Sequence, residues 1–163
     1  MRSSMEDTMG PMVRRLVFVG LVGCIFVVWN AHADHDVVVA QPRTPIVVTR
    51  IYTGPDGQTH AEQIDVKLTP GGGSGELSEM AAVTGLQFRR QAPNYFQDWH
   101  PAPRRQYVIT LSGRGEIELA GGKKIPLGPG HILLAEDVAG KGHISRGVGN
   151  EDRISLFIPL AER

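Results

Sequence analysis

Short apolar runs separated by glycine and proline turns fill the second half of the chain. Between positions 106 and 160 a turn such as Gly128-Pro129-Gly130 recurs every few residues. The runs between the turns are rich in β-branched and aromatic residues, which favour strands. No segment there has the period of a long amphipathic helix. This pattern predicts an all-β protein, either a sandwich or a barrel.

Nine short strands are expected from the same signals over the whole chain. They span residues 46–52, 60–68, 83–90, 106–111, 116–119, 123–127, 131–135, 143–148 and 153–160. Residues 76–82 are expected to form a helical turn and residues 91–99 a loop. A closed or double-sheet barrel is favoured, because so many short strands in an open sheet would leave exposed edges.

The N-terminus has the character of a targeting segment. Arg14-Arg15 precede an apolar run at 16–29, and Ala31-His32-Ala33 supplies the small residues that a signal peptidase reads. At about 1.5 Å per residue the run covers roughly 21 Å, less than the roughly 30 Å bilayer core. Residues 1–33 are therefore predicted to be a cleaved signal peptide of a periplasmic or secreted protein. An uncleaved membrane anchor is the alternative, and a lipoprotein signal at Cys24 is a less favoured one.

The remaining chain is expected to hold a flexible lead-in at 34–45 and one barrel at 46–161. Lysine plus arginine and aspartate plus glutamate both number 17, so no excess of positive charge favours a nucleic-acid partner. Cys24 is the only cysteine and lies in the segment expected to be removed. Any metal ion would then be held by nitrogen and oxygen ligands.

Two polar clusters stand at the start of strands, about 40 positions apart. The first runs from Asp98 to Gly113 and contains His100 and Gln106, and the second is Gly140-Lys141-Gly142-His143. Their spacing resembles the two motifs of the cupin superfamily, and the first cluster is similar to that of small single-domain cupins without an established reaction. The resemblance covers residues 46–160 and implies a jelly-roll barrel.

Metal-dependent cupins hold one divalent ion with two histidines and a glutamate of the first motif and a histidine of the second. Here Ala102 and Gln106 stand where a histidine and the glutamate are expected. The resemblance therefore implies at most a damaged site for Fe, Mn, Ni, Cu or Zn at His100 and His143. The alternative is that both histidines line a pocket that is empty or holds an organic ligand.

Strand alternation suggests two further ligand-binding residues. In the strand expected at 60–68, His60 and Glu62 share a face with Ile64, Val66 and Leu68. That apolar face is expected to be the inner one. His60 or Glu62, or the weaker ligand Gln106, could then complete a metal site.

Other residues near the clusters have both functional and structural interpretations. Arg104 and Arg105 cannot both face inward, and the one at the barrel mouth, taken as Arg104, could hold a carboxylate or phosphate. Trp99 is expected either to stack on a ligand or to pack as a lid on the rim. Glu136 and Asp137 are expected to be solvated loop charges, with an acid–base role as the alternative.

Three functions remain open from the sequence. The first is a barrel that binds a small polar or anionic molecule through His60, Glu62, Trp99, Arg104 and Gln106. The second is a metal-dependent enzyme of oxygenase or isomerase type. The third is a structural barrel that pairs with a second copy to form a homodimer.

Overall fold

A computed structural model describes residues 43–71, 73 and 75–162. The expected signal peptide and all but the last residues of the lead-in lie outside this range. The strands are β1 (Val47–Thr53), β2 (Thr59–Asp65), β3 (Thr69–Pro70), β4 (Glu76–Leu77), β5 (Gln87–Gln91), β6 (Phe96–His100), β7 (Gln106–Ser112), β8 (Gly115–Glu118), β9 (Lys124–Leu127), β10 (Ile132–Glu136), β11 (His143–Gly147) and β12 (Arg153–Pro159). One short 3-10 turn, η1 (Ala120–Gly122), precedes β9. Within the described residues no helix is long and apolar enough to cross a bilayer.

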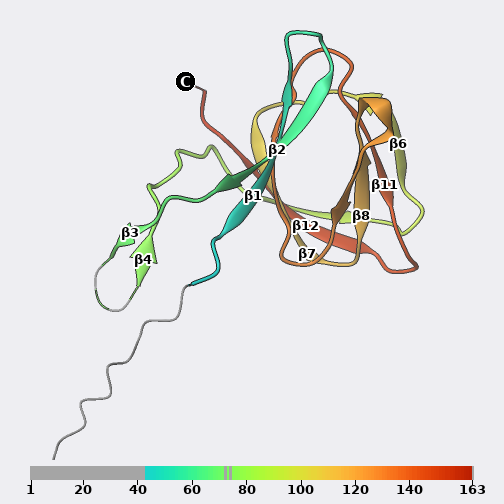
Figure 1. Cartoon of the computed structure of the whole chain (residues 1–163). Coiled ribbons are helices and arrows are strands. Elements are labelled where there is room, and N and C mark those ends of the chain that lie inside the picture. Colours follow the sequence, from blue (N-terminus) through green and yellow to red (C-terminus); the bar gives the residue numbers. More distant parts are fainter. Residues whose placement is uncertain (1–42, 72, 74, 163) are drawn as a thin grey trace, which may run out of the picture. The chain divides into compact units, whose positions relative to one another are not determined.

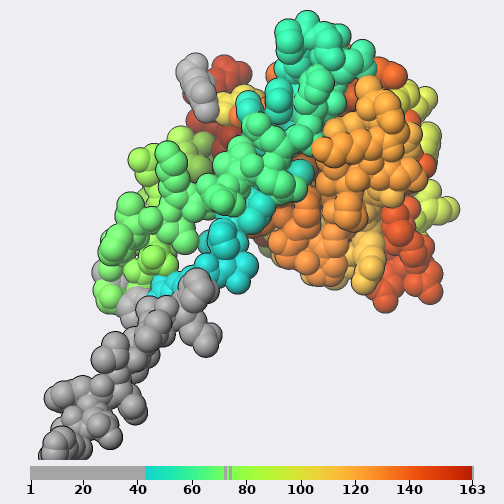
Figure 2. Space-filling view, viewed as in Figure 1, coloured from blue at the N-terminus to red at the C-terminus, as the bar shows by residue number. Residues whose placement is uncertain are grey.

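Ten of these strands form two sheets that face each other (Figure 1). The larger sheet has the order β2-β1-β10-β7-β12-β5, and the smaller one has the order β6-β11-β8-β9. The strands pair antiparallel except for β1 and β10, which run parallel although they lie far apart in the chain. Figure 2 shows the β1–β2 hairpin, cyan to green, at the surface of the molecule. The expected all-β jelly-roll barrel is confirmed.

The core lies between the sheets and follows from strand alternation. Val108 of β7 and Leu133 of β10 face the interior from the larger sheet, and Ile117 of β8 and Leu127 of β9 face it from the smaller one. All four side chains are at most 5% exposed. Because every second residue of a strand points inward, polar residues at the same parity are also brought into the interior.

Three expectations about the elements are wrong. The segment expected as a loop at 91–99 contains most of β6, an edge strand paired only with β11. Residues 76–82 form no helical turn, because Glu76 and Leu77 pair as β4 with β3. The strand expected at 83–90 is shorter and later, at Gln87–Gln91. All these segments are largely solvent-exposed, so an apolar alternation signal is weak there.

Candidate functional site

A cavity of about 200 Å³ lies between the two sheets. Its polar lining consists of three arginines, two histidines, four glutamines and one serine. The side chains that determine its chemistry include His100, His143, Gln106, Arg89, Arg104 and Arg153. Neither an aspartate nor a glutamate lines the cavity within the described part of the chain. The interior is therefore strongly biased toward positive charge, although the whole chain is neutral.

His100 and His143 lie side by side on the neighbouring strands β6 and β11. They are direct partners in the strand pairing, and their ring centres are 4.5 Å apart with planes inclined by 56°. Gly142 makes this approach possible, because a Cβ at that position would overlap the carbonyl group of His100. Gly142 also has a positive φ of 73°, which favours glycine.

Hydrogen bonds orient both imidazole rings through the same nitrogen. The Nδ1 atom of His143 is 2.6 Å from Oδ2 of Asp137, which also accepts a hydrogen bond from the Thr59 hydroxyl at 3.1 Å. Nδ1 of His100 donates to the backbone carbonyl of Asp98 at 2.7 Å. The Nε2 atom of each ring is then the one left for a ligand, a proton or a metal ion.

Asp137 is fully buried, so the expectation that it is a solvated loop charge is wrong. It continues the parity of Leu133 and Ala135 beyond the end of β10, which places its side chain toward the interior. That parity was the available sequence signal. Its Oδ1 atom is buried without a hydrogen-bond partner in the described part of the protein.

Burial controls the charge of the cavity histidine on β6. Loss of hydration lowers the pKa of His100 below its ordinary value of 6.5, and the neighbouring His143 acts in the same direction. The hydrogen bond to the Asp98 carbonyl opposes this shift without cancelling it. His100 is therefore a neutral imidazole at pH 7 and can accept a hydrogen bond through Nε2.

Arg153 is one of several cavity residues that were not predicted from the sequence. It begins β12 and is only 3% exposed. Its Nε and one terminal nitrogen donate to Thr110 Oγ1 at 3.2 and 2.8 Å, and the other terminal nitrogen donates to Gln91 Oε1 at 3.1 Å. Loss of hydration lowers the pKa of Arg153, but an arginine still carries its charge at neutral pH. The only sequence signal for its position was strand alternation, because Arg153 begins a strand and lies on the same face as Ser155 and Phe157.

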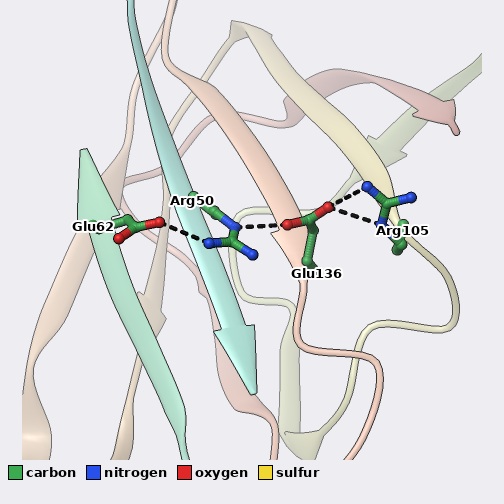
Figure 3. Close-up of polar contacts among 4 residues, drawn as sticks. All are labelled: Arg50, Glu62, Arg105 and Glu136. Atoms are coloured by element: carbon green, nitrogen blue, oxygen red, sulfur yellow. Dashed lines mark hydrogen bonds and ion pairs between the residues drawn. The ribbon is translucent and has the colours of Figure 1, made fainter. Parts of the chain in front are cut away.

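His60 and Glu62 do not line the cavity, so the expectation that they face inward is wrong. Nε2 of His60 lies 3.0 Å from Asp56 at an exposed position. Glu62 accepts a hydrogen bond from Arg50, outside the barrel (Figure 3). The inner positions of β2 are Thr59, which reaches Asp137, and Ala61, which packs on the core.

Glu62 is the first member of a row of alternating acidic and basic side chains on the outside of the barrel (Figure 3). Arg50 of β1 donates to Glu62 at 2.8 Å and to Glu136 at 2.6 Å. Arg105, just before β7, donates to the other oxygen of Glu136. Glu136 is therefore the acceptor for two arginines and not the solvated loop charge that was expected.

The remaining predicted ligand residues divide between the two sides of the barrel. Arg104 and Gln106 line the cavity, and Gln106 is 6% exposed. Trp99 does not line it, because it precedes His100 in β6 and points to the opposite face. There the amine of Lys141 lies 3.9 Å from the centre of the indole ring.

The donors around the two histidines do not fit the metal centre that the cupin resemblance implies. No group of three or more histidine, cysteine, aspartate or glutamate side chains suited to a metal ion occurs among residues 43–71, 73 and 75–162. His100 and His143 offer two imidazoles, and Gln106 adds only a neutral amide. A catalytic first-row metal usually has three good protein ligands.

Comparison with known proteins adds little to this picture. No family model and no curated protein matches the chain. Among solved structures, protein NMB1881 from Neisseria meningitidis is 14% identical with a TM-score of 0.38, over 54% of this chain and 90% of that one. A putative ethanolamine utilization protein Q from Salmonella typhimurium has the same identity and TM-score, over 74% of this chain and 100% of that one. The assignment of the fold therefore rests on the strand order described above.

Proposed function

We propose that this chain is an exported cupin-like barrel that binds a small anionic molecule in its interior. The observation that carries the proposal is the lining of the cavity, with three arginines, two histidines and no carboxylate in the described residues. Arginine presents a planar fork of donors that suits carboxylate and phosphate groups. A positive interior in a neutral chain selects an anion and not a cationic or apolar ligand.

The size and polarity of the cavity narrow the ligand further. Its volume of about 200 Å³ is below the roughly 300–1,000 Å³ of pockets for drug-sized molecules. Gln106 and the neutral His100 supply hydrogen-bonding groups at one end. The ligand is therefore a small molecule that carries both negative charge and a neutral polar group. Export follows from the signal peptide expected at 1–33 and is part of the proposal.

One observation favours a metal-dependent alternative. Both Nδ1 atoms are engaged, and the Asp137–His143 pair has the arrangement in which a carboxylate orients a metal-binding histidine. Against this stand the missing third ligand and the positive surroundings. A divalent ion at His100 and His143 is therefore our second candidate.

Isothermal titration of the exported protein with small anions tests the first candidate. We expect binding of organic acids or phosphate that weakens at least tenfold in Arg104→Gln combined with Arg89→Gln, since these charges line the cavity. The matched control is Arg114→Gln, which removes an exposed arginine outside the cavity. Absence of binding by any anion, with a folded protein, would leave a structural barrel as the better interpretation.

A further inference from the structure

Arg153 marks the end of the cavity that lies away from the histidines. Strand β12 starts at Arg153 and ends at Pro159, and both residues line the cavity. Pro159 is paired with Gln106, which is paired with Ala135, two residues before the Asp137 that holds His143. On the facing sheet, the Cβ position of Gly115 lies 3.1 Å from Cδ of Arg153, and Gly115 pairs with Gly147 of β11. Four residues of β11, about 13 Å of backbone, separate Gly147 from His143, so Arg153 and the histidines lie toward opposite ends of the cavity.

The guanidinium of Arg153 is buried without a counterion. Its three hydrogen bonds end on the neutral groups of Thr110 and Gln91. In the described residues no carboxylate lies within ion-pair distance of it, although Arg50, Arg105 and Arg146 all have such partners. A guanidinium has five N–H donors, so these hydrogen bonds leave two of them unused. The hydroxyl of Tyr95, which is close enough to raise the pKa of Arg153, is neutral and supplies no opposite charge.

A buried charge without an opposite charge is costly, and proteins rarely retain one without a partner. Arg153 is only 3% exposed and lines the cavity. The missing opposite charge is therefore expected to come from the molecule that occupies the cavity.

We propose that the ligand is a small organic carboxylate whose carboxylate group pairs with Arg153, while a second polar group at its other end faces His100 and His143. This inference rests on the proposed binding function and specifies the class of ligand and its direction in the cavity. One carboxylate balances one buried guanidinium. Inorganic phosphate is compact, so it could pair with Arg153 but could not also reach the histidines.

Titration calorimetry with a series of probes tests the proposal. The probes are acetate, 4-hydroxybutanoate, 5-hydroxypentanoate, 6-hydroxyhexanoate and inorganic phosphate, added to the exported protein at constant ionic strength. We expect one of the hydroxy acids to bind at least tenfold more tightly than acetate, because its carboxylate can pair with Arg153 while its hydroxyl donates to Nε2 of His100. We also expect it to bind more tightly than phosphate.

Two variants isolate the role of Arg153. Arg153→Lys keeps the charge but loses the bidentate fork, and Arg153→Met removes the charge at similar length. We expect at least a tenfold loss of affinity for the bound hydroxy acid in the first and a larger loss in the second. Arg90→Gln is the matched control, since Arg90 is an exposed arginine of the neighbouring strand, 3.8 Å from Asp152, and its affinity should stay within twofold.

The outcomes separate this inference from the proposed function. Equal carboxylate affinity in wild type and the Arg153 variants overturns the anchor but leaves anion binding intact. Tighter binding of phosphate overturns the carboxylate class. Binding of no anion at all refutes the proposed function itself.

A wild-type measurement covers the case in which the variants do not fold. In nitrogen-15 spectra the Nε–H signal of Arg153 should shift when the bound hydroxy acid is added and should not shift with the same concentration of chloride. A signal that does not move at saturating carboxylate refutes the pairing.

Discussion

Replacing Glu136 by glutamine should destabilise the barrel substantially, although Glu136 lies outside the cavity. Its side chain is 11% exposed and accepts hydrogen bonds from Arg105 and Arg50 (Figure 3). Hydrogen bonds to charged groups contribute about 1.5–3 kcal/mol each, and the two arginines remain about one-third solvated. We therefore expect Glu136→Gln to lower the free energy of unfolding by about 2–3 kcal/mol, toward the lower end of the range for broken buried pairs.

Urea denaturation at pH 7 measures this loss, and Glu62→Gln is the control. Glu62 bonds to the same Arg50 but is 44% exposed, so its replacement should cost less than about 1 kcal/mol. A double-mutant cycle with Arg105→Gln should show coupling between Arg105 and Glu136. A loss below about 1 kcal/mol, or equal to that of Glu62→Gln, would refute the reasoning.

The pH dependence of the same difference gives a second check. Burial alone would raise the pKa of Glu136, but the hydrogen bonds from Arg105 and Arg50 outweigh it and lower the pKa below its ordinary 4.5. A carboxylate with a lowered pKa stabilises the fold fully above its unfolded pKa and loses this contribution as the pH falls through the folded pKa. The difference between wild type and Glu136→Gln should therefore be constant near neutral pH and shrink below about pH 4.5.

Three further predictions concern the cavity. Gly142→Ala should lower the free energy of unfolding by about 3 kcal/mol or more in thermal or urea denaturation. The added Cβ would overlap the His100 carbonyl group, and the backbone at this position is left-handed. The control is Gly149→Ala, where φ is also positive but the space is open, and it should cost only about 1 kcal/mol. The imidazole of His100 should titrate below 6.5 by NMR. Since the unfolded chain then binds a proton first, His100 should reduce stability as the pH falls below 6.5, and a slope unchanged in His100→Gln would contradict this. Elemental analysis after dialysis should find less than one equivalent of divalent metal, whereas a stoichiometric ion that is lost in His100→Ala and in His143→Ala would establish the metal-dependent alternative.

Local patterns in the sequence determined the class of fold. Turns such as Gly128-Pro129-Gly130 and the short apolar runs between such turns predicted short strands. Turns and strands of this kind are specified by residues close together in the sequence. The edge strand β6 was not predicted from the sequence. Phe96 and its neighbours are exposed, so their side chains show no apolar alternation that would mark an inner face. Sequence spacing, through the cupin resemblance, also brought attention to His100 and His143, which the structure places 4.5 Å apart by ring centre.

The identity of the remaining cavity residues was decided by tertiary structure. Alternation states which residues share a face of a strand, but not which face is covered by the opposite sheet. For β2 the inner face carries Thr59 and Ala61, so His60 and Glu62 lie outside. The burial of Arg153 and Asp137 likewise depends on pairings between distant strands. The sequence thus predicted a β-barrel and, through the cupin resemblance, a jelly roll with His100 and His143 at one site. Long-range strand pairing decided that the cavity is lined by arginines and, within the described residues, by no carboxylate.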